Sequence, residues 1–552
     1  MKHTPPTPLA RWAAVAALAT LAGGCPDGDV RKDAIPERPR PTLRLVVATD
    51  LAGTLEPCGC TSRPLGGIDR LAAAVADVRE AGVPTLTLHA GDLFFGPAPH
   101  APGEETPAQE LWKAETVAQV LARIGLDAAT PGARDVGHGA PRFAALAEAV
   151  EAPVLASGVR LTLPGSGEDD EPRTRSLEGA WMRQVGDTKV GVVGVLWPDP
   201  AADWPEGFAG PSDPIAAAAK RAKGLRSDGA DIVLALMHGS RRQARDLGRR
   251  LPVDFVIMGG LSEEEVIPPS GAGDGLLLHA GRQGQGVLTV DVWARGEGSW
   301  QDVGELGRKT DRERLEGRIA ELKARIAAWK DDPSVSDDDV KAQKTRLAGM
   351  RDELEALTRP AALPSGNAIA ARYRELPAEA PRAPAVTKVL EQFFRKVNAH
   401  NRRVYADAEP RPVPEDEAGF VGSEACASCH RPAHDWWKST PHGRAYATLE
   451  ERHKEFNLDC VSCHVTGYGE PGGSTVTHVD DLKNVGCESC HGPGGWHVDN
   501  PDEPLRFMRT EVPENVCVSC HNPEHSDLFQ YEAYRNVLIM PGHGLPPKSK
   551  GE

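Results

Sequence analysis

Four copies of one short motif lie in the last quarter of this 552-residue chain. Each copy has two cysteines separated by two residues, and a histidine follows the second cysteine directly. The copies are Cys426–His430, Cys460–His464, Cys487–His491 and Cys517–His521. Two thiols at this spacing can each add to one vinyl group of a haem, and the adjacent histidine then stands under the iron. The repeated motif therefore predicts covalent attachment of four c-type haems.

The pattern assigns a role to each residue of the four motifs. The thioether cysteines are Cys426, Cys429, Cys460, Cys463, Cys487, Cys490, Cys517 and Cys520, and the proximal iron ligands are His430, His464, His491 and His521. Paired cysteines also build zinc ribbons, and exported proteins join cysteines in disulfides. Neither alternative gives a reason for a histidine after every second cysteine, so haem attachment is the favoured interpretation.

The N-terminus reads as a targeting segment. An apolar stretch, Trp12–Leu21, is too short to span a bilayer, and Ala22-Gly23-Gly24-Cys25 follows it. Residues 1–25 resemble a bacterial lipoprotein signal peptide, which implies that Cys25 carries a lipid and anchors the chain to a membrane. An ordinary cleaved secretory signal is the alternative. Both interpretations predict an exported protein, either periplasmic or associated with the outer membrane, and residues 26–42 are then a linker.

Composition excludes one class of partner and supports a multidomain chain. Charged residues make up 26% of the sequence and the net charge is −16, so nothing favours nucleic acid, which selects basic surfaces. The length predicts two or three soluble domains. We predict an α/β domain over 43–305, a helical hairpin over 306–360, a linker with a helix over 361–415 and a haem domain over 416–552.

The predicted haem domain is rich in turns. Gly- and Pro-rich stretches at 467–473 and 492–495 indicate turns and short helices, so a mostly α-helical or irregular domain is expected. A segment this short builds little apolar core of its own. We expect the porphyrins to supply much of the interior, as a metal does in other small domains.

Residues of about 420–545 resemble the tetrahaem cytochrome family that includes the electron acceptor of hydroxylamine oxidation, the cytochrome c554-like proteins. The matching stretches are Cys426–His430, Trp437–His442, Cys460–Gly473 and Val485–Gly494. The resemblance implies electron transfer between redox protein partners. It also implies two histidine ligands at most of the haem irons, with one haem open on its distal side.

The same resemblance implies distal ligands by position. His497 corresponds to the distal ligand of the Cys426 haem and His442 to that of the Cys487 haem. His543 is our candidate for the Cys517 haem, with His525 as its rival. The Cys460 haem corresponds to the open one, although His453 is close to it in the sequence.

The N-terminal half alternates strand and helix patterns. Leu71–Ala81 has a helical pattern, and the predicted strands are Leu43–Thr49, Thr85–Ala90, Lys189–Leu196, Asp231–Leu236 and Phe255–Met258. This alternation predicts an α/β sandwich. Asp50, Asp92 and His238 fall at the ends of three of these strands and are candidate metal ligands.

These strand ends resemble the calcineurin-like metallophosphoesterases, including bacterial periplasmic 5′-nucleotidases of the UshA-like type. That family implies a two-metal centre, and this chain departs from it. Ala52 replaces the second ligand, Gly132–Asp135 lacks the Asn-His pair, and Gly259–Glu263 lacks both histidines of the last turn. We therefore predict no ordinary phosphoester hydrolysis, and at most one divalent metal.

Cys58 and Cys60 follow the first strand, near the position of the missing ligand. Two thiolates can hold a soft metal or carry out thiol redox chemistry. A loop with two unremarkable thiols is the alternative, and the residues alone leave both open.

A helical hairpin is predicted after the α/β domain. Leu315, Ile319 and Leu322 recur at heptad spacing, Asp332-Pro333 breaks the helix, and the pattern then restarts. An amphipathic helix over Val386–Val397 is expected to lead into the haem domain.

The favoured function is electron relay by an exported multihaem cytochrome, and an electron-transfer protein is favoured over an enzyme. Two enzymatic alternatives stay open. An open iron above His464 would suit an oxidoreductase acting on a small nitrogen compound. A metal restored to the N-terminal half would make the chain a haem-linked hydrolase.

Overall fold

The computed structural model describes residues 38–57, 63–96, 107–165, 170–197, 204–260, 266–329, 335–522, 526 and 528–538. The elements below all belong to the unit Pro39–Glu552. Predictions that concern Cys25, Cys58, Cys60, His525 and His543 fall outside the described residues.

The first sheet is built around β1 (Leu43–Thr49), which pairs in parallel with β2 (Thr85–Ala90) and antiparallel with β13 (Gly286–Trp293). Beyond β2 lies β3 (Ala128–Thr130), and beyond β13 lie β15 (Ala368–Glu375) and β14 (Gln301–Asp302). Parallel β1 and β2 end at the same edge of the sheet, which brings the residues that follow them together.

The second sheet has four parallel strands at its centre. They are β7 (Thr188–Leu196), β9 (Ile232–His238), β10 (Phe255–Gly259) and β12 (Gly275–His279). Antiparallel β6 (Ala180–Val185) and β11 (Ile267–Ala272) form its edges. The central strands are buried on both faces, which explains their unbroken apolar runs.

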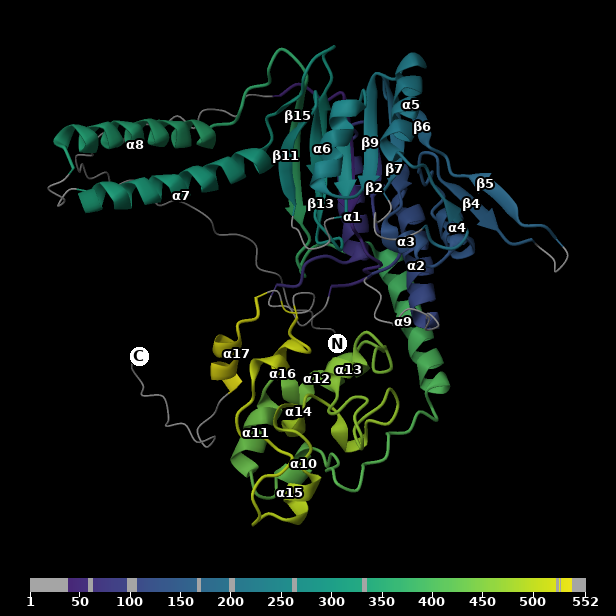
Figure 1. Cartoon of the computed structure of the whole chain (residues 1–552), viewed down its shortest axis with the longest axis vertical. Coiled ribbons are helices and arrows are strands. Elements are labelled where there is room, and N and C mark those ends of the chain that lie inside the picture. The colour runs from purple at the N-terminus through teal and green to yellow at the C-terminus, as the bar shows by residue number, and fades with distance from the viewer. Residues whose placement is uncertain are drawn as a thin grey trace, which may run out of the picture. The chain divides into compact units, whose positions relative to one another are not determined.

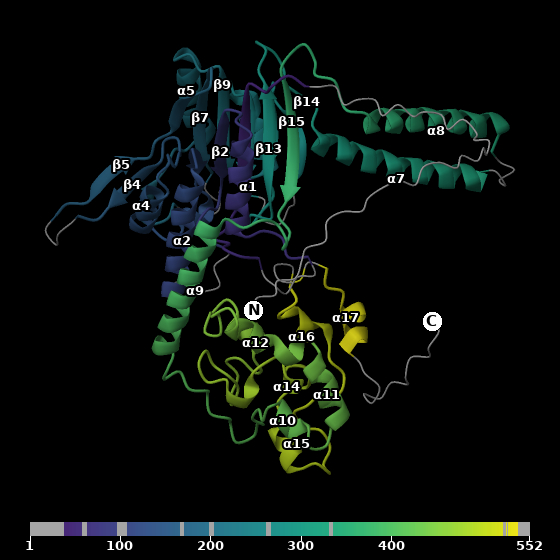
Figure 2. The same cartoon turned by 180° about the vertical axis from the view of Figure 1, so that it is seen from behind.

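Helices cover the outer face of each sheet. Leu45, Leu88, Leu236 and Phe255 belong to the core between the sheets. The first sheet is covered by α1 (Ile68–Glu80), α2 (Ala108–Ile124) and α9 (Pro384–Val404), and the second by α5 (Pro214–Ser227) and α6 (Arg241–Arg250) (Figures 1 and 2). The predicted α/β sandwich is confirmed.

Smaller elements complete the sandwich: α3 (Ala133–Val136), α4 (Ala140–Ala149) and a sheet of β4 (Arg160–Leu163), β5 (Arg173–Ser176) and β8 (Phe208–Ala209).

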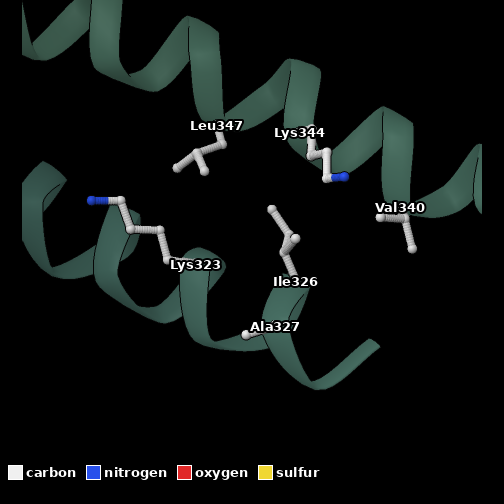
Figure 3. Close-up of a pocket in the computed structure, with 6 residues that line it drawn as sticks. All are labelled: Lys323, Ile326, Ala327, Val340, Lys344 and Leu347. Carbon is white, nitrogen blue, oxygen red and sulfur yellow. The ribbon is translucent and has the colours of Figure 1, made fainter. Parts of the chain in front are cut away.

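Two long helices, α7 (Glu305–Trp329) and α8 (Asp337–Thr358), lie side by side (Figures 1 and 2). Leu315, Ile319 and Leu322 of α7 pack against Leu347 and Met350 of α8. A gap of about 180 Å³ opens between the helices, lined by Lys323, Ile326, Ala327, Val340, Lys344 and Leu347 (Figure 3). The small side chain of Ala327 leaves this space unfilled.

Residues 361–415, predicted to be a linker with a helix, belong in large part to the sandwich. Strand β15 pairs with β13 from Ala368 to Glu375, and its Ile369 lies in the core between the sheets. Leu390 and Phe393 of α9 pack in the helical layer on the first sheet. The domain boundary was wrong because β15 buries mostly alanines, which give a weak strand signal. The hairpin is therefore an insertion between β14 and β15.

The C-terminal segment consists of short helices and turns. The helices are α10 (Ser423–Cys426), α11 (Arg431–Ser439), α12 (Ala445–Glu450), α13 (Val461–His464), α14 (Cys487–His491), α15 (Gly495–Asp499), α16 (Glu514–Val518) and α17 (Tyr531–Leu538). Its apolar cluster is small and includes Tyr446, Leu449 and Val461. In the part of the chain that the structure describes, no helix is both long and apolar enough to cross a membrane.

Candidate haem-attachment sites and metal centre

Each attachment motif is one turn of helix. The backbone N–H of His430 donates to the Cys426 carbonyl oxygen at 2.9 Å, and that of His521 donates to the Cys517 carbonyl at 2.8 Å. The second and third motifs lie at α13 and α14. In a helical turn, residues i, i+3 and i+4 share one face, so both thiols and the imidazole of a motif stand on the same side. This is the arrangement that attachment of one haem requires.

Three of the four motif histidines are oriented through Nδ1. The distance from Nδ1 to an oxygen is 2.6 Å for His464 (Ala445 carbonyl), 2.8 Å for His491 (Arg509 carbonyl) and 3.2 Å for His521 (Ser526 Oγ). A carbonyl can only accept, so Nδ1 of His464 and of His491 carries the proton. Nε2 is then left with its lone pair, as a proximal iron ligand needs.

The motifs lie against one another, which local sequence patterns do not predict. Helix α10 of the first motif packs against α14 of the third, and α14 packs against α16 of the fourth. A hydrogen bond between the Cys426 and Cys487 thiols raises the pKa of Cys426 and lowers the pKa of Cys487 to about 6. A hydrogen bond with Cys463 likewise raises the pKa of Cys520. These thiols stand for the thioether sulfurs of attached haems. The first motif thus adjoins the third, and the second adjoins the fourth.

Buried Glu488, within the third motif, ties it to the first. Its carboxylate accepts hydrogen bonds from the backbone N–H groups of Val421, Gly422 and Gly494, at 2.7 to 3.2 Å. Only 2% of the residue is exposed. The Cys487 N–H also donates to Ser423 Oγ at 3.1 Å. Sequence reasoning missed Glu488 because a glutamate between two cysteines reads as a solvent-facing residue.

Among the predicted distal ligands, His442 is the best defined by its contacts. Its ring centroid lies 6.1 Å from that of His521, in the fourth motif, although the resemblance implied the Cys487 haem of the third. This separation leaves room for one iron between the two imidazoles. Burial, and then the charge of His521, lower the pKa of His442, which keeps its ring neutral. Nδ1 of His497 is buried without a hydrogen-bond partner, and His453 has a left-handed backbone, with φ of 55°.

The three predicted metal ligands of the α/β domain come together. Asp50 follows β1, Asp92 follows β2 and His238 ends β9, and one ligand atom from each lies within 4.8 Å of the others. Asp50 and Asp92 are almost fully buried and have positive φ values of 47° and 34°. Such backbone strain in non-glycine residues gathers at functional sites.

The electrostatics of this cluster favour a cation. His238 Nε2 lies 3.4 Å from Asp92 Oδ2, and His279 Nε2 lies 3.6 Å from Asp50 Oδ2. Burial alone would lower the pKa of His238, but the hydrogen bond and charge of Asp92 outweigh it and raise that pKa. Burial lowers the pKa of His89 to about 4, although Asp50 and Asp92 act against the shift.

A fit to a metal is supported by a buried nitrogen of the cluster that lacks a hydrogen-bond partner, Nδ1 of His238. Two carboxylates and an imidazole suit a divalent ion such as Mn²⁺, Fe²⁺ or Zn²⁺. The cluster fits one such ion, and the ion would supply Lewis acidity when bound.

The loop that carries Asp92 is braced by Asp135, which sequence reasoning also missed. The Asp135 carboxylate accepts from the N–H groups of Leu93, Phe94 and Gly132 at 2.8 to 2.9 Å. Burial, and then the charge of Asp92, raise the pKa of Asp135 to about 7. Its role is to fix the backbone on which Asp92 stands.

The C-terminal segment is similar to known proteins. Residues 425–492 match the family Cytochrome c554 and c-prime. Cytochrome c-554 of Nitrosomonas europaea is 38% identical over 94 residues, which cover 14% of this chain and 40% of that protein. The cytochrome c554 family implies covalently bound haem c and a role in electron transfer. The chain spans well under two thirds of this relative.

Solved structures similar to the chain include two hydrolases of Thermus thermophilus. One is a 5′-nucleotidase precursor, with 18% identity and a TM-score of 0.42, covering 69% of this chain and 62% of that one. The other is the sulfate thiohydrolase SoxB, with 15% identity and a TM-score of 0.43, covering 81% and 74%. The NAD nucleotidase of Haemophilus influenzae has 15% identity and a TM-score of 0.41, covering 69% and 63%. These remote likenesses concern the fold and say nothing of activity.

We expect Glu488→Gln to destabilise the C-terminal haem-binding segment. The amide would turn an N–H₂ group toward backbone N–H donors that now share a carboxylate, and at least one buried donor would lose its acceptor. The expected cost is about 1–3 kcal/mol of unfolding free energy, measured by denaturant titration of the full-length haem protein. Glu503→Gln is the control, because Glu503 is exposed at the surface of the same segment. Equal losses in the two variants would contradict the role assigned to Glu488.

Proposed function

We propose that this chain is an exported cytochrome that carries four haem c groups and relays electrons between redox protein partners. The observation that supports the proposal is the close packing of the motifs, in which α10 of the first lies against α14 of the third and α14 lies against α16 of the fourth. Attachment sites in contact favour rapid transfer from one haem to the next. Lipidation of Cys25 would keep this relay at a membrane surface.

In this proposal the motif histidines are proximal ligands and further histidines complete most of the irons. His442 stays the candidate for the Cys487 haem that the resemblance implies, and its 6.1 Å separation from His521 makes it a second candidate for the Cys517 haem beside His543. His497 remains the candidate for the Cys426 haem. Two imidazoles per iron give low-spin haem suited to electron transfer, because no position is left for a substrate.

The α/β domain, in this proposal, does not hydrolyse phosphoesters. In-line displacement at phosphorus uses two metal ions that clamp the attacking and leaving oxygens. Asp50, Asp92 and His238 are too few ligands to hold both, and Ala52 offers none. Ala133 and Arg134 stand where the family has its Asn-His pair, so the donor for charge on the transferring phosphoryl group is missing. Cys58 and Cys60 stay candidates for redox or soft-metal binding.

The haem count tests the relay directly. A pyridine haemochrome assay on purified full-length protein is expected to give four haems per chain, with the absorption of low-spin c-type haem. A Cys517→Ser/Cys520→Ser variant should give three and keep the rest of the spectrum, because only the fourth attachment is removed. Two or fewer haems in the unmodified chain would contradict the proposal.

Hydrolysis is tested separately. With added Mn²⁺, Zn²⁺ or Ca²⁺, full-length protein is expected to release phosphate from a 5′-nucleotide or a UDP-sugar no faster than an Asp92→Asn variant. A Cys58→Ser/Cys60→Ser variant serves as a second comparison, since restored thiolate ligands are the one route by which the chain could regain a second ion. Robust turnover that either variant abolishes would make the protein a haem-linked hydrolase.

A further inference from the structure

Both oxygens of Asp92 are already engaged by the protein. The backbone N–H of Arg134 donates to Asp92 Oδ1 at 3.1 Å, and Arg134 Nε lies 3.5 Å from Oδ2. His238 Nε2 approaches the same Oδ2 at 3.4 Å. Asp92 therefore lies between two nitrogen-bearing side chains of the protein, those of Arg134 and His238.

Arg134 is fixed in this position by its backbone. It lies in α3, one residue before Asp135, whose carboxylate binds three backbone N–H groups of the Asp92 loop and of Gly132. Contact between the two segments is so close that a Cβ on Gly132 would lie 2.0 Å from Asp92 Oδ1. The main chain at Arg134 thus cannot move away from Asp92 without disrupting both segments.

The charge balance then decides how many ions the cluster holds. Asp50 and Asp92 supply two negative charges, and the guanidinium of Arg134 keeps its positive charge at any ordinary pH. The side chains of Arg134 and Asp92 are 29% and 5% exposed, so solvent screens their interaction only in part. One divalent ion on Asp50, Asp92 and His238 is compatible with that balance. A second divalent ion on the Arg134 side of Asp92 would meet a like charge.

We propose that Arg134 occupies the place of the second metal ion, and that the cluster is a single-ion site for a divalent transition metal such as Mn²⁺. The assignment rests on the proposed non-hydrolytic role of the α/β domain and explains it, because Arg134 is a permanent cation that bears neither water nor hydroxide.

The test is a metal count on the full-length haem protein. After equilibration with Mn²⁺ and removal of unbound ion, elemental analysis is expected to give one manganese per chain besides the haem iron. With the haems reduced, the electron paramagnetic resonance signal should be that of an isolated Mn²⁺ ion and not of an exchange-coupled pair. Two ions per chain, a coupled signal, or no retained manganese would overturn the assignment.

Variants separate Arg134 from general effects on folding. Arg134→Gln removes the fixed positive charge and keeps the backbone N–H donor. We expect the variant to bind its single Mn²⁺ roughly tenfold more tightly in a calorimetric titration, because the repulsion between the arginine and the ion is lost. Arg142→Gln, whose arginine pairs with Glu115 at the surface, is the matched control and should bind as the unmodified chain does. Unchanged affinity in Arg134→Gln would overturn the proposal. One manganese with robust hydrolysis would instead contradict only the proposed function.

Discussion

The haem-binding segment depends on one geometric constraint, the placement of two thiols and an imidazole on a single turn of helix. Each motif is short enough to be one turn, and the His Nδ1 contacts then aim the ring at the position of an iron. Few apolar side chains surround these turns, and Tyr446, Leu449 and Val461 make up most of the cluster they form. The segment consequently relies on its covalently held cofactors for the interior that a larger domain would build from side chains.

The α/β domain does not depend on a cofactor for its interior in this way, because its sheets and helices bury an extensive core of their own. Its strands end at Asp50, Asp92 and His238, where the fold concentrates charge at one edge of the sandwich. Arg134 and Asp135 then neutralise and brace that edge with groups of the chain itself. Such a site keeps the architecture of a metal centre, while the guanidinium of Arg134 supplies part of the positive charge that metal ions would otherwise supply.

Sequence reasoning recovered the strands with strong signals and the cofactor chemistry. Strand β1 was predicted at its observed bounds, because its apolar run of leucines and valines marks it clearly. Strand β15 was missed, since its buried alanines resemble a linker and its partner β13 lies far away along the chain. The C-x-x-C-H spacing predicted the attachment residues because their chemistry is local.

The contacts between motifs could not be predicted from local sequence patterns, because they join residues that lie far apart along the chain. The spacing of Cys426 and Cys487 does not indicate that their thiols lie close together. The roles of Glu488 and Arg134 depend on contacts with residues that are distant in the sequence. The ring of His442 lies beside the histidine of the fourth motif, a proximity that local sequence patterns do not indicate.

The most direct test of the account is a crystal structure of the full-length protein with metals assigned by anomalous scattering at the iron edge. The account predicts four iron peaks, each bound by one of His430, His464, His491 and His521, and each within a porphyrin joined to the two cysteines of the same motif. Zinc in place of iron in any motif, a disulfide within a motif, or fewer than four iron sites would contradict it.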